Sequence, residues 1–293
     1  MKKINQFILE HLECPKLSII EKLKLYHHVD EKLTLSNQSK LKYNYRPKNV
    51  KDLRKLLEQL LEERGPNADL NDIDVSNIEN MFYENVNNKR LNGLFRNLDI
   101  HNIDISNWDV SNCYNMSFLF AGCENFDCDL SKWKVDNVEN MEKMFGGCKA
   151  FTGKGLDKWH VDSCRYMQGM FIGCSSLNDK NIEKWNVESV LNMHHMFSRC
   201  TNLDCDFSNW DVGNVRHMNY MFFKCIKFTG KGLDEWSVKD MGDSVEGMFE
   251  ECYKLNVDLS AWENDVEINY EDMFYNCDNM PKDKLPKFVI VDF

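Results

Sequence analysis

Cysteine is the residue type that could do the most chemistry in this sequence. The chain has 12 cysteines in 293 residues, and a thiol can be a nucleophile, a metal ligand or half of a disulfide. Seven of them form a regular series, namely Cys123, Cys148, Cys174, Cys200, Cys225, Cys252 and Cys277. No base partner and no zinc-ligand spacing accompanies the series. We therefore predict seven small buried core residues, with a disulfide ladder or a zinc site as alternatives.

The remaining candidates for chemistry are scattered. Five cysteines lie outside the series without an evident histidine partner: Cys14, Cys113, Cys128, Cys164 and Cys205. The pair His194-His195 stands where other units have Glu-Lys or Asn-Tyr, which predicts surface histidines. The sequence GKG at 153–155 and 230–232 lacks the GxxxxGK[ST] spacing of a phosphate loop.

Four aspartates, each four residues before a tryptophan, could cap turns or line a weak calcium site: Asp104, Asp129, Asp206 and Asp258. They lack the ligand density of a calcium loop. We therefore predict no catalytic residue, no cofactor and no metal, and a protein that is not an enzyme. A cysteine- or metal-dependent enzyme is the alternative.

The cysteine series belongs to a repeat that includes every tryptophan. The tryptophans, spaced by 25 or 26 residues, are Trp108, Trp133, Trp159, Trp185, Trp210, Trp236 and Trp262. A Met-Phe or Leu-Phe pair follows each Trp, and a Cys stands three residues after the Phe. A degenerate eighth copy precedes these, with Ile73-Asp74-Val75 and Leu94-Phe95 at the corresponding positions and a loop expected near 81–90. A fixed period of this size is typical of stacked repeats.

Each unit is expected to contain a short strand and a short helix. Trp133 and Val135 alternate as in a strand. Val138, Met141, Met144, Phe145 and Cys148 lie at offsets that favour one face of a helix. One such unit cannot bury its apolar face alone, whereas stacked units can.

These motifs resemble a known family. W-D-V-S-N at 108–112 and N-M-x-x-M-F-x-x-C at 140–148 are similar to BspA-like leucine-rich repeat surface proteins, of the subtype first noted in mycoplasma lipoproteins. The resemblance covers about residues 66–280, and 45–81 is similar to the lead-in of gut-bacterial and phage-associated members. It implies an α/β leucine-rich-repeat-like solenoid of about eight coils, and adhesion or protein binding in place of catalysis.

The repeat and its flanking sequences divide the chain into three predicted segments. Residues 1–65 are predicted to form a basic helical N-terminal cap, with the clearest helix at 48–64, ended by Gly65-Pro66. Residues 66–280 form the repeats, and 281–293 a capping strand built on FVIVDF. Alternatively, residues 1–40 form a separate docking module that supports self-assembly.

Charge is unevenly distributed along the chain. Residues 1–64 carry 14 basic and 9 acidic side chains, a net of +5, and the remainder carries 22 and 38, a net of −16. The acidic body argues against nucleic acid as partner and favours a basic protein. No apolar run approaches the ~18 residues that span a bilayer, so no membrane insertion is expected. Polar residues interrupt the N-terminal apolar stretch, which predicts no signal peptide and a cytoplasmic or phage-associated protein.

The candidate binding surface is the residue between Trp and Val in each repeat. In an extended segment this side chain points away from the core when its two neighbours point inward. The positions are Asp109, Lys134, His160, Asn186, Asp211, Ser237 and Glu263. Their types vary while the flanking positions stay fixed. We expect a non-enzymatic scaffold that binds a protein through this face, with a bacterial-surface or virion adhesin for host protein or glycan as the alternative.

Overall fold

The computed structural model describes residues 43–84, 93–177, 180–239, 242, 244–263 and 267–289. The chain divides into two compact units, Met1–Asn44 and Tyr45–Phe293. The predicted elements of residues 1–40, Cys14 and most of the loop expected at 81–90 lie outside the described residues.

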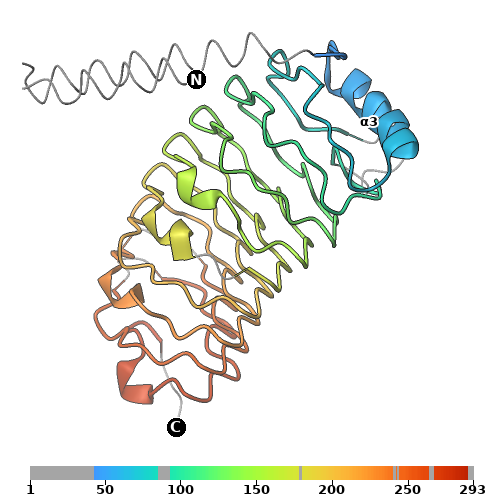
Figure 1. The fold of residues 1–293 in the computed structure, drawn as a ribbon. Helices are drawn as coiled ribbons and strands as arrows, with labels where there is room; N and C mark the ends of the chain where they lie inside the picture. Colours follow the sequence, from blue (N-terminus) through green and yellow to red (C-terminus); the bar gives the residue numbers. More distant parts are fainter. Residues whose placement is uncertain are drawn as a thin grey trace, which may run out of the picture. The chain divides into compact units, whose positions relative to one another are not determined.

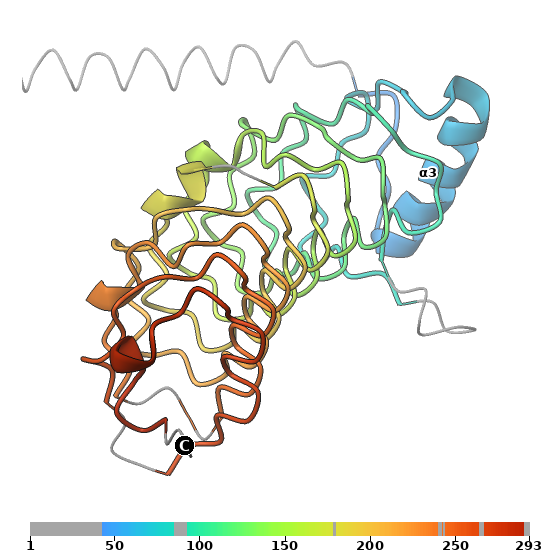
Figure 2. The ribbon, with the colours of Figure 1, turned by 90° about the horizontal axis from the view of Figure 1, so that it is seen from below.

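The helix expected at 48–64 is α3, Val50–Arg64. The Asn49 side chain accepts hydrogen bonds from the N–H groups of Lys51 and Asp52 at its start, and Gly65, at φ 83°, ends it. Its buried face consists of Leu53, Leu57, Leu60 and Leu61. The helix lies at the beginning of the coil stack (Figures 1 and 2), and its buried leucines belong to the core.

Arg54 extends from α3 to the backbone of the first coil. Its Nη1 donates to the carbonyls of Leu94 at 2.7 Å and Arg96 at 2.8 Å. In the next coil, the equivalent carbonyls are Leu119 O and Ala121 O. They accept hydrogen bonds from Phe95 N and from Arg96 Nη1 of the coil before them. Arg54 therefore supplies donors that a preceding coil would otherwise provide.

The repeats form coils that lie side by side (Figure 1). Isolated parallel bridges link the same position in successive coils: Asn80 to Asn115, Asn140, Tyr166, Asn192 and His217, and, further along, Ser244 to Asn269. Equivalent residues are thus in register from coil to coil, and the backbone of one coil pairs with the next.

The expectation of an α/β solenoid made of strand–helix coils is wrong. Within the described residues, α3 is the one α-helix, and pairing between coils is limited to isolated bridges without strands. The coils contain only short 3₁₀ helices: η2 Leu156–Lys158, η3 Lys180–Lys184, η4 Leu233–Glu235 and η5 Lys282–Lys284. The segment 138–148, expected to be helical, is a succession of turns.

Left-handed residues explain why that segment is not a helix. Lys143, at φ 48°, and Gly147, at φ 80°, interrupt any right-handed helix. His195 and Arg199 repeat the pattern at φ 57° and 65°. Consecutive turns therefore replace the predicted helix in these coils.

The hydrogen bonds of this segment alternate between two directions. Met144 N and Cys148 N close turns in their own coil, on Met141 O and Phe145 O. Phe145 N instead donates to Met170 O of the next coil at 2.9 Å. A helix would keep these donors within the segment. The lateral bonds offset the cost of the left-handed residues and tie the coils together.

The Trp-x-Val segments are extended but do not form the predicted strands. Trp159, for example, has φ −83° and ψ 132°. The link to the preceding coil comes from the indole: Trp133 Nε1 donates to Ile105 O at 3.0 Å, and Trp159 Nε1 to Leu130 O at 3.1 Å. A side-chain donor thus connects the coils where a strand ladder was expected.

Aromatic rings continue from coil to coil through the core. The Trp108, Trp133 and Trp159 rings stack at 6.4 and 6.5 Å. Phe145 and Phe171 stack at 5.7 Å with planes 2° apart. Pairs of this kind contribute roughly 0.5–1.5 kcal/mol each beyond the area they bury. The identical rings of each repeat therefore stabilise the stacking of the coils.

The predicted C-terminal strand is not seen in its described part. Residues 282–284 form η5, and Phe288 and Val289 lie outside any strand, partly buried against the core. Residues 290–293, the rest of FVIVDF, lie outside the described residues.

Candidate binding surface

The seven residues that follow Trp lie in equivalent places on successive coils. Their neighbours explain the orientation, because all seven tryptophans are 5% exposed or less and the valine two residues after each of the first six is also buried. Glu263 is followed by Asn264, which lies outside the described residues. Six of the seven middle side chains are exposed: Lys134, His160, Asn186, Asp211, Ser237 and Glu263. Asp109 is half-buried and accepts a hydrogen bond from Ser111 Oγ at 2.6 Å.

Two of these side chains, Asn186 and His160, contact acidic residues of the preceding coil. Asn186 Nδ2 donates to Asp162 Oδ1 at 2.8 Å, and His160 Nδ1 lies 3.4 Å from Asp136 Oδ1. The surface therefore combines two rows of side chains. One row is the first residue after Trp in a coil (Trp+1), and the other is the third residue after Trp in the preceding coil (Trp+3). Sequence reasoning found only the first of these two rows.

An asparagine ladder runs beside this surface, at the fourth residue after Trp. Asn112 Nδ2 donates to Ser76 O at 3.1 Å, Asn137 Nδ2 to Ser111 O at 2.8 Å, and Asn214 Nδ2 to Glu188 O at 2.9 Å. Each of these hydrogen bonds satisfies a backbone carbonyl of the preceding coil. The ladder was visible in the sequence as the Asn of W-D-V-S-N, but its hydrogen-bonding role was not.

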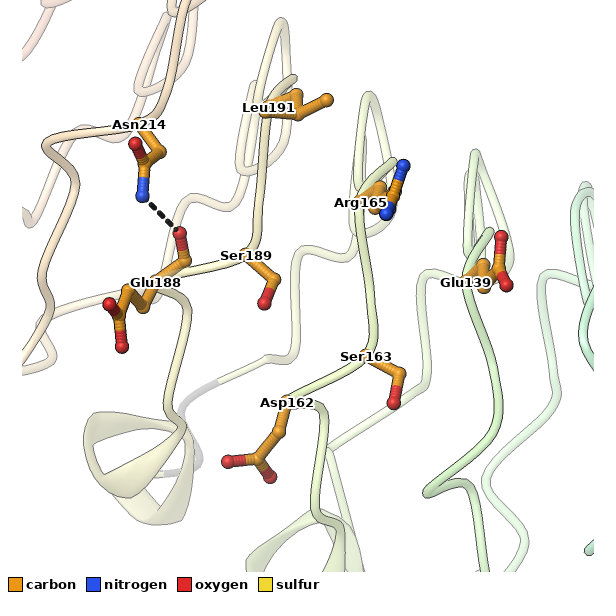
Figure 3. A pocket seen from close by; sticks show the side chains of 8 residues that line it. All are labelled: Glu139, Asp162, Ser163, Arg165, Glu188, Ser189, Leu191 and Asn214. Atoms are coloured by element: carbon orange, nitrogen blue, oxygen red, sulfur yellow. Dashed lines mark hydrogen bonds between the residues drawn. The ribbon is translucent and has the colours of Figure 1, made fainter.

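Two consecutive serines interrupt the ladder. Ser163 and Ser189 stand where the neighbouring coils have Asn137 and Asn214. The donor of a serine is one bond closer to its backbone than that of asparagine, so it reaches less far across the coil spacing. A groove lies at this interruption, and Figure 3 shows the two serines inside it, with the Asn214–Glu188 bond at its border.

The groove has a volume of about 630 Å³. Its lining is polar and charged and comes from adjacent coils: Glu139, Asp162, Ser163, Arg165, Glu188, Ser189, Leu191 and Asn214. Arg165 and Leu191 stand along one side and Asp162 and Glu188 along the other (Figure 3). Three carboxylates against one guanidinium make the groove acidic.

The seven cysteines of the repeat are thiols buried in the core, at 9% exposure or less. Each Sγ donates to the carbonyl of a phenylalanine one coil earlier, for example Cys174 to Phe145 O at 3.0 Å and Cys200 to Phe171 O at 3.0 Å. Burial raises the pKa of the Cys200 thiol well above its ordinary value. Such a thiol is a poor nucleophile. The cysteine of each repeat therefore has two structural roles, since it fills the core and its thiol forms a hydrogen bond to the preceding coil.

The two adjacent histidines are half-buried and in contact with each other. The His195 ring stacks on Tyr220 with centroids 5.0 Å apart. Burial, followed by the charges of His194, Lys143 and Arg199, lowers the pKa of His195 to about 4. The imidazole is therefore neutral near pH 7. The prediction of surface histidines at 194 and 195 is therefore correct only in part, because both side chains are half-buried.

The aspartates before tryptophan cap turns. Asp129 Oδ1 accepts from Ser131 N at 3.0 Å, and Asp206 Oδ1 from Ser208 N at 3.1 Å. The Lys231 ammonium, with this backbone bond, lowers the pKa of Asp206 to about 2. The described residues contain no group of three or more His, Cys, Asp or Glu side chains arranged to hold a metal ion.

The GKG segments shape the backbone before two tryptophans. Gly155 and Gly232 are left-handed, at φ 92° and 84°, and start η2 and η4. Lys154 and Lys231 pair with Asp129 and Asp206 of the preceding coil, at 3.7 and 2.6 Å. The two glycines therefore supply the left-handed backbone from which these 3₁₀ helices begin.

Among the helices of the described residues, none has the length and apolar composition of a membrane-spanning segment.

Comparison with known proteins identifies the repeat. Residues 69–181 and 165–288 each match the family described as "Mycoplasma protein of unknown function, DUF285". Neither a curated protein nor a solved structure matches the chain. The two matches together span about three quarters of the sequence. The chain therefore belongs to the DUF285 family of mycoplasma-type repeat proteins.

Proposed function

We propose that this protein is a non-enzymatic scaffold that binds another protein through the exposed Trp+1 face of its coils and the groove beside it at Ser163 and Ser189. The observation that carries the proposal is the interruption of the asparagine ladder. The groove arises at the two coils where serine replaces asparagine, so its shape follows from side chains and not from a break in the backbone stack.

The charges of the groove favour a basic polypeptide segment. Asp162 already accepts from Asn186, whereas no ion pair to Glu139 or Glu188 occurs among the residues described. A lysine or arginine of a partner can pair with these two carboxylates, and Arg165 can receive an acidic or carbonyl group. The net charge of −16 over residues 65–293 would attract such a partner before contact.

The remaining chemistry supports binding over catalysis. The repeat thiols are buried with raised pKa values, and the turn aspartates are occupied by backbone N–H groups. The resemblance to BspA-like proteins, which implies adhesion or protein binding, agrees with the same proposal.

The test fills the groove without weakening the fold. Ser163→Asn/Ser189→Asn places an asparagine at both interrupted positions, where it can donate to the carbonyl of the preceding coil as Asn137 does. Ser131→Asn/Ser208→Asn makes the same chemical change at two positions before tryptophan and is the matched control. All forms would be immobilised and exposed to native lysate, and captured proteins identified by mass spectrometry.

We expect a protein captured by wild type and by the control, and lost from the groove-filled variant at unchanged melting temperature. A second variant reverses the charges of Asp109, Lys134, Asp211 and Glu263, and tests how far the contact extends along the face. Equal capture by wild type and the groove-filled variant would contradict the proposed site, and a glycan in place of a protein partner would favour the adhesin alternative.

A further inference from the structure

We propose that a second groove, lined by Lys180, Lys227 and Lys254, binds an anionic oligosaccharide. This proposal is independent of the protein-binding groove, since the two have no lining residue in common. The second groove has a volume of about 680 Å³, within the range of small-ligand sites. Its other lining residues are Ser176, Asn202, Asp204 and Thr229.

Lysines of the coils differ in whether a carboxylate lies beside the ammonium group. Lys149–Glu124 at 2.8 Å and Lys224–Glu251 at 2.9 Å are ion pairs, whereas Lys132 Nζ donates to the neutral Asn107 amide at 2.8 Å. In this groove, Lys227 Nζ donates to the neutral Asn202 amide at 2.6 Å. No ion pair of Lys180 or Lys254 occurs among the described residues. No carboxylate of the described residues therefore forms an ion pair with either ammonium group.

The repeat explains the unpaired charge of Lys180. Lys154 and Lys231, five residues before their tryptophans, each pair with an aspartate 25 residues earlier. Lys180 occupies the same position before Trp185, but the residue 25 positions earlier is Gly155. The partner that the other coils provide is therefore missing at this lysine.

The one carboxylate in the groove is already engaged. Asp204 Oδ1 accepts from Thr229 Oγ1 at 2.7 Å and from Thr229 N at 3.1 Å. Three lysines against this single carboxylate leave a net charge of +2 on the lining, within a part of the chain that carries −16 overall. A local positive groove on an acidic body selects for anions at this place.

The neutral lining indicates the class of anion. Ser176, Asn202 and Thr229 also line the groove. Asn202 Nδ2 already donates to Ser175 O and Thr229 Oγ1 to Asp204, so their oxygen atoms can accept from sugar hydroxyls, and the Ser176 hydroxyl can donate or accept. An acidic peptide is the competing anion, and the poly-glutamate arm of the test distinguishes it from a saccharide. A saccharide that carries sulfate or carboxylate groups satisfies both the lysines and the hydroxyls.

The test measures binding of defined saccharides to the full chain by isothermal titration calorimetry at low salt. Heparin-derived octasaccharide supplies sulfate, oligogalacturonate supplies carboxylate, and a neutral dextran fragment and poly-glutamate are the comparison ligands. Lys180→Gln/Lys227→Gln/Lys254→Gln removes the groove charges. Lys149→Gln/Lys154→Gln/Lys158→Gln removes three lysines that lie beside carboxylates and causes the same change in net charge.

We expect at least one of the two anionic saccharides to bind wild type and the control, with affinity that falls as salt rises. The groove variant should lose on the order of 10- to 100-fold in affinity, as charge-assisted contacts are removed. Absence of saccharide binding to wild type, equal losses in both variants, or equally tight binding of poly-glutamate would each overturn the proposal. Circular dichroism of each variant verifies that the fold is retained.

Discussion

Glycine at position 155 provides the sharpest test of how closely the coils approach. Gly155 is left-handed, at φ 92°, and a Cβ added to it would lie 2.3 Å from Ser131 N and 2.8 Å from Leu130 C of the preceding coil. Backbone atoms cannot rotate away as a side chain can. Gly173 is also left-handed, at φ 75°, but its Cβ would meet nothing closer than Gly147 Cα at 3.7 Å.

The two alanine variants therefore separate strain from contact. Both Gly155→Ala and Gly173→Ala force an L-residue into the left-handed region, at a cost of about 1–2 kcal/mol. Gly155→Ala alone also pushes adjacent coils apart, which adds about 1–3 kcal/mol in the manner of an overpacked core. We expect losses in the free energy of unfolding of about 1–2 kcal/mol for Gly173→Ala and about 2–5 kcal/mol for Gly155→Ala.

Urea unfolding followed by tryptophan fluorescence and by circular dichroism would measure the difference. Two probes are needed because stacked repeats can unfold in parts. Gly232→Ala should repeat the larger effect, since its Cβ would lie 2.2 Å from Ser208 N. Equal destabilisation by Gly155→Ala and Gly173→Ala would refute the close approach of the coils at this point.

Three further predictions concern the cap, the thiols and acid stability. Arg54→Met keeps the stem of the side chain but removes the donors to the carbonyls of Leu94 and Arg96, and should lower the free energy of unfolding by about 1–3 kcal/mol in urea titrations; an unchanged value would contradict the capping role. Cys200 should resist iodoacetamide at pH 8 and react on unfolding, because burial raises its pKa well above the ordinary value; peptide mass spectrometry that finds it labelled in the native protein would disprove this. The pKa of His195 is lowered from 6.5 to about 4, so its neutral form stabilises the fold above pH 6.5 and that contribution is lost as pH falls toward 4. Asparagine tolerates a left-handed backbone, so His195→Asn is the variant to test. It should reduce the loss of stability between pH 7 and pH 4.5 by on the order of 1 kcal/mol, a value reduced because the His195 ring is half-exposed to solvent. An unaltered pH dependence of the free energy of unfolding would exclude His195 as a cause.

The sequence contained enough to predict the repeat but not the backbone of a coil. Spacing alone identifies Trp133, Phe145 and Cys148 as one recurring set, and all three are buried. The interval from Val138 to Cys148 also fits a helix, which led to the wrong element. The deciding factor is non-local, because Phe145 N has a carbonyl of the next coil within reach.

The binding face was predictable in part. Burial of Trp and Val fixes the exposed position between them, a rule that needs only local geometry. The groove depends instead on Ser163 and Ser189, whose significance appears only once Asn137 and Asn214 are seen to bond across coils. Similarly, the lysine groove joins residues from different coils that no short motif connects.

The most direct test of the proposed function places a photo-crosslinking residue in the groove at Ser189, with the exposed Glu62 of α3 as the control position. After irradiation in native lysate, the Ser189 form should yield a discrete heavier adduct that contains one protein partner, and the Glu62 form should yield none. An absence of adducts from Ser189, or the same adducts from both positions, would contradict a protein-binding site at this groove.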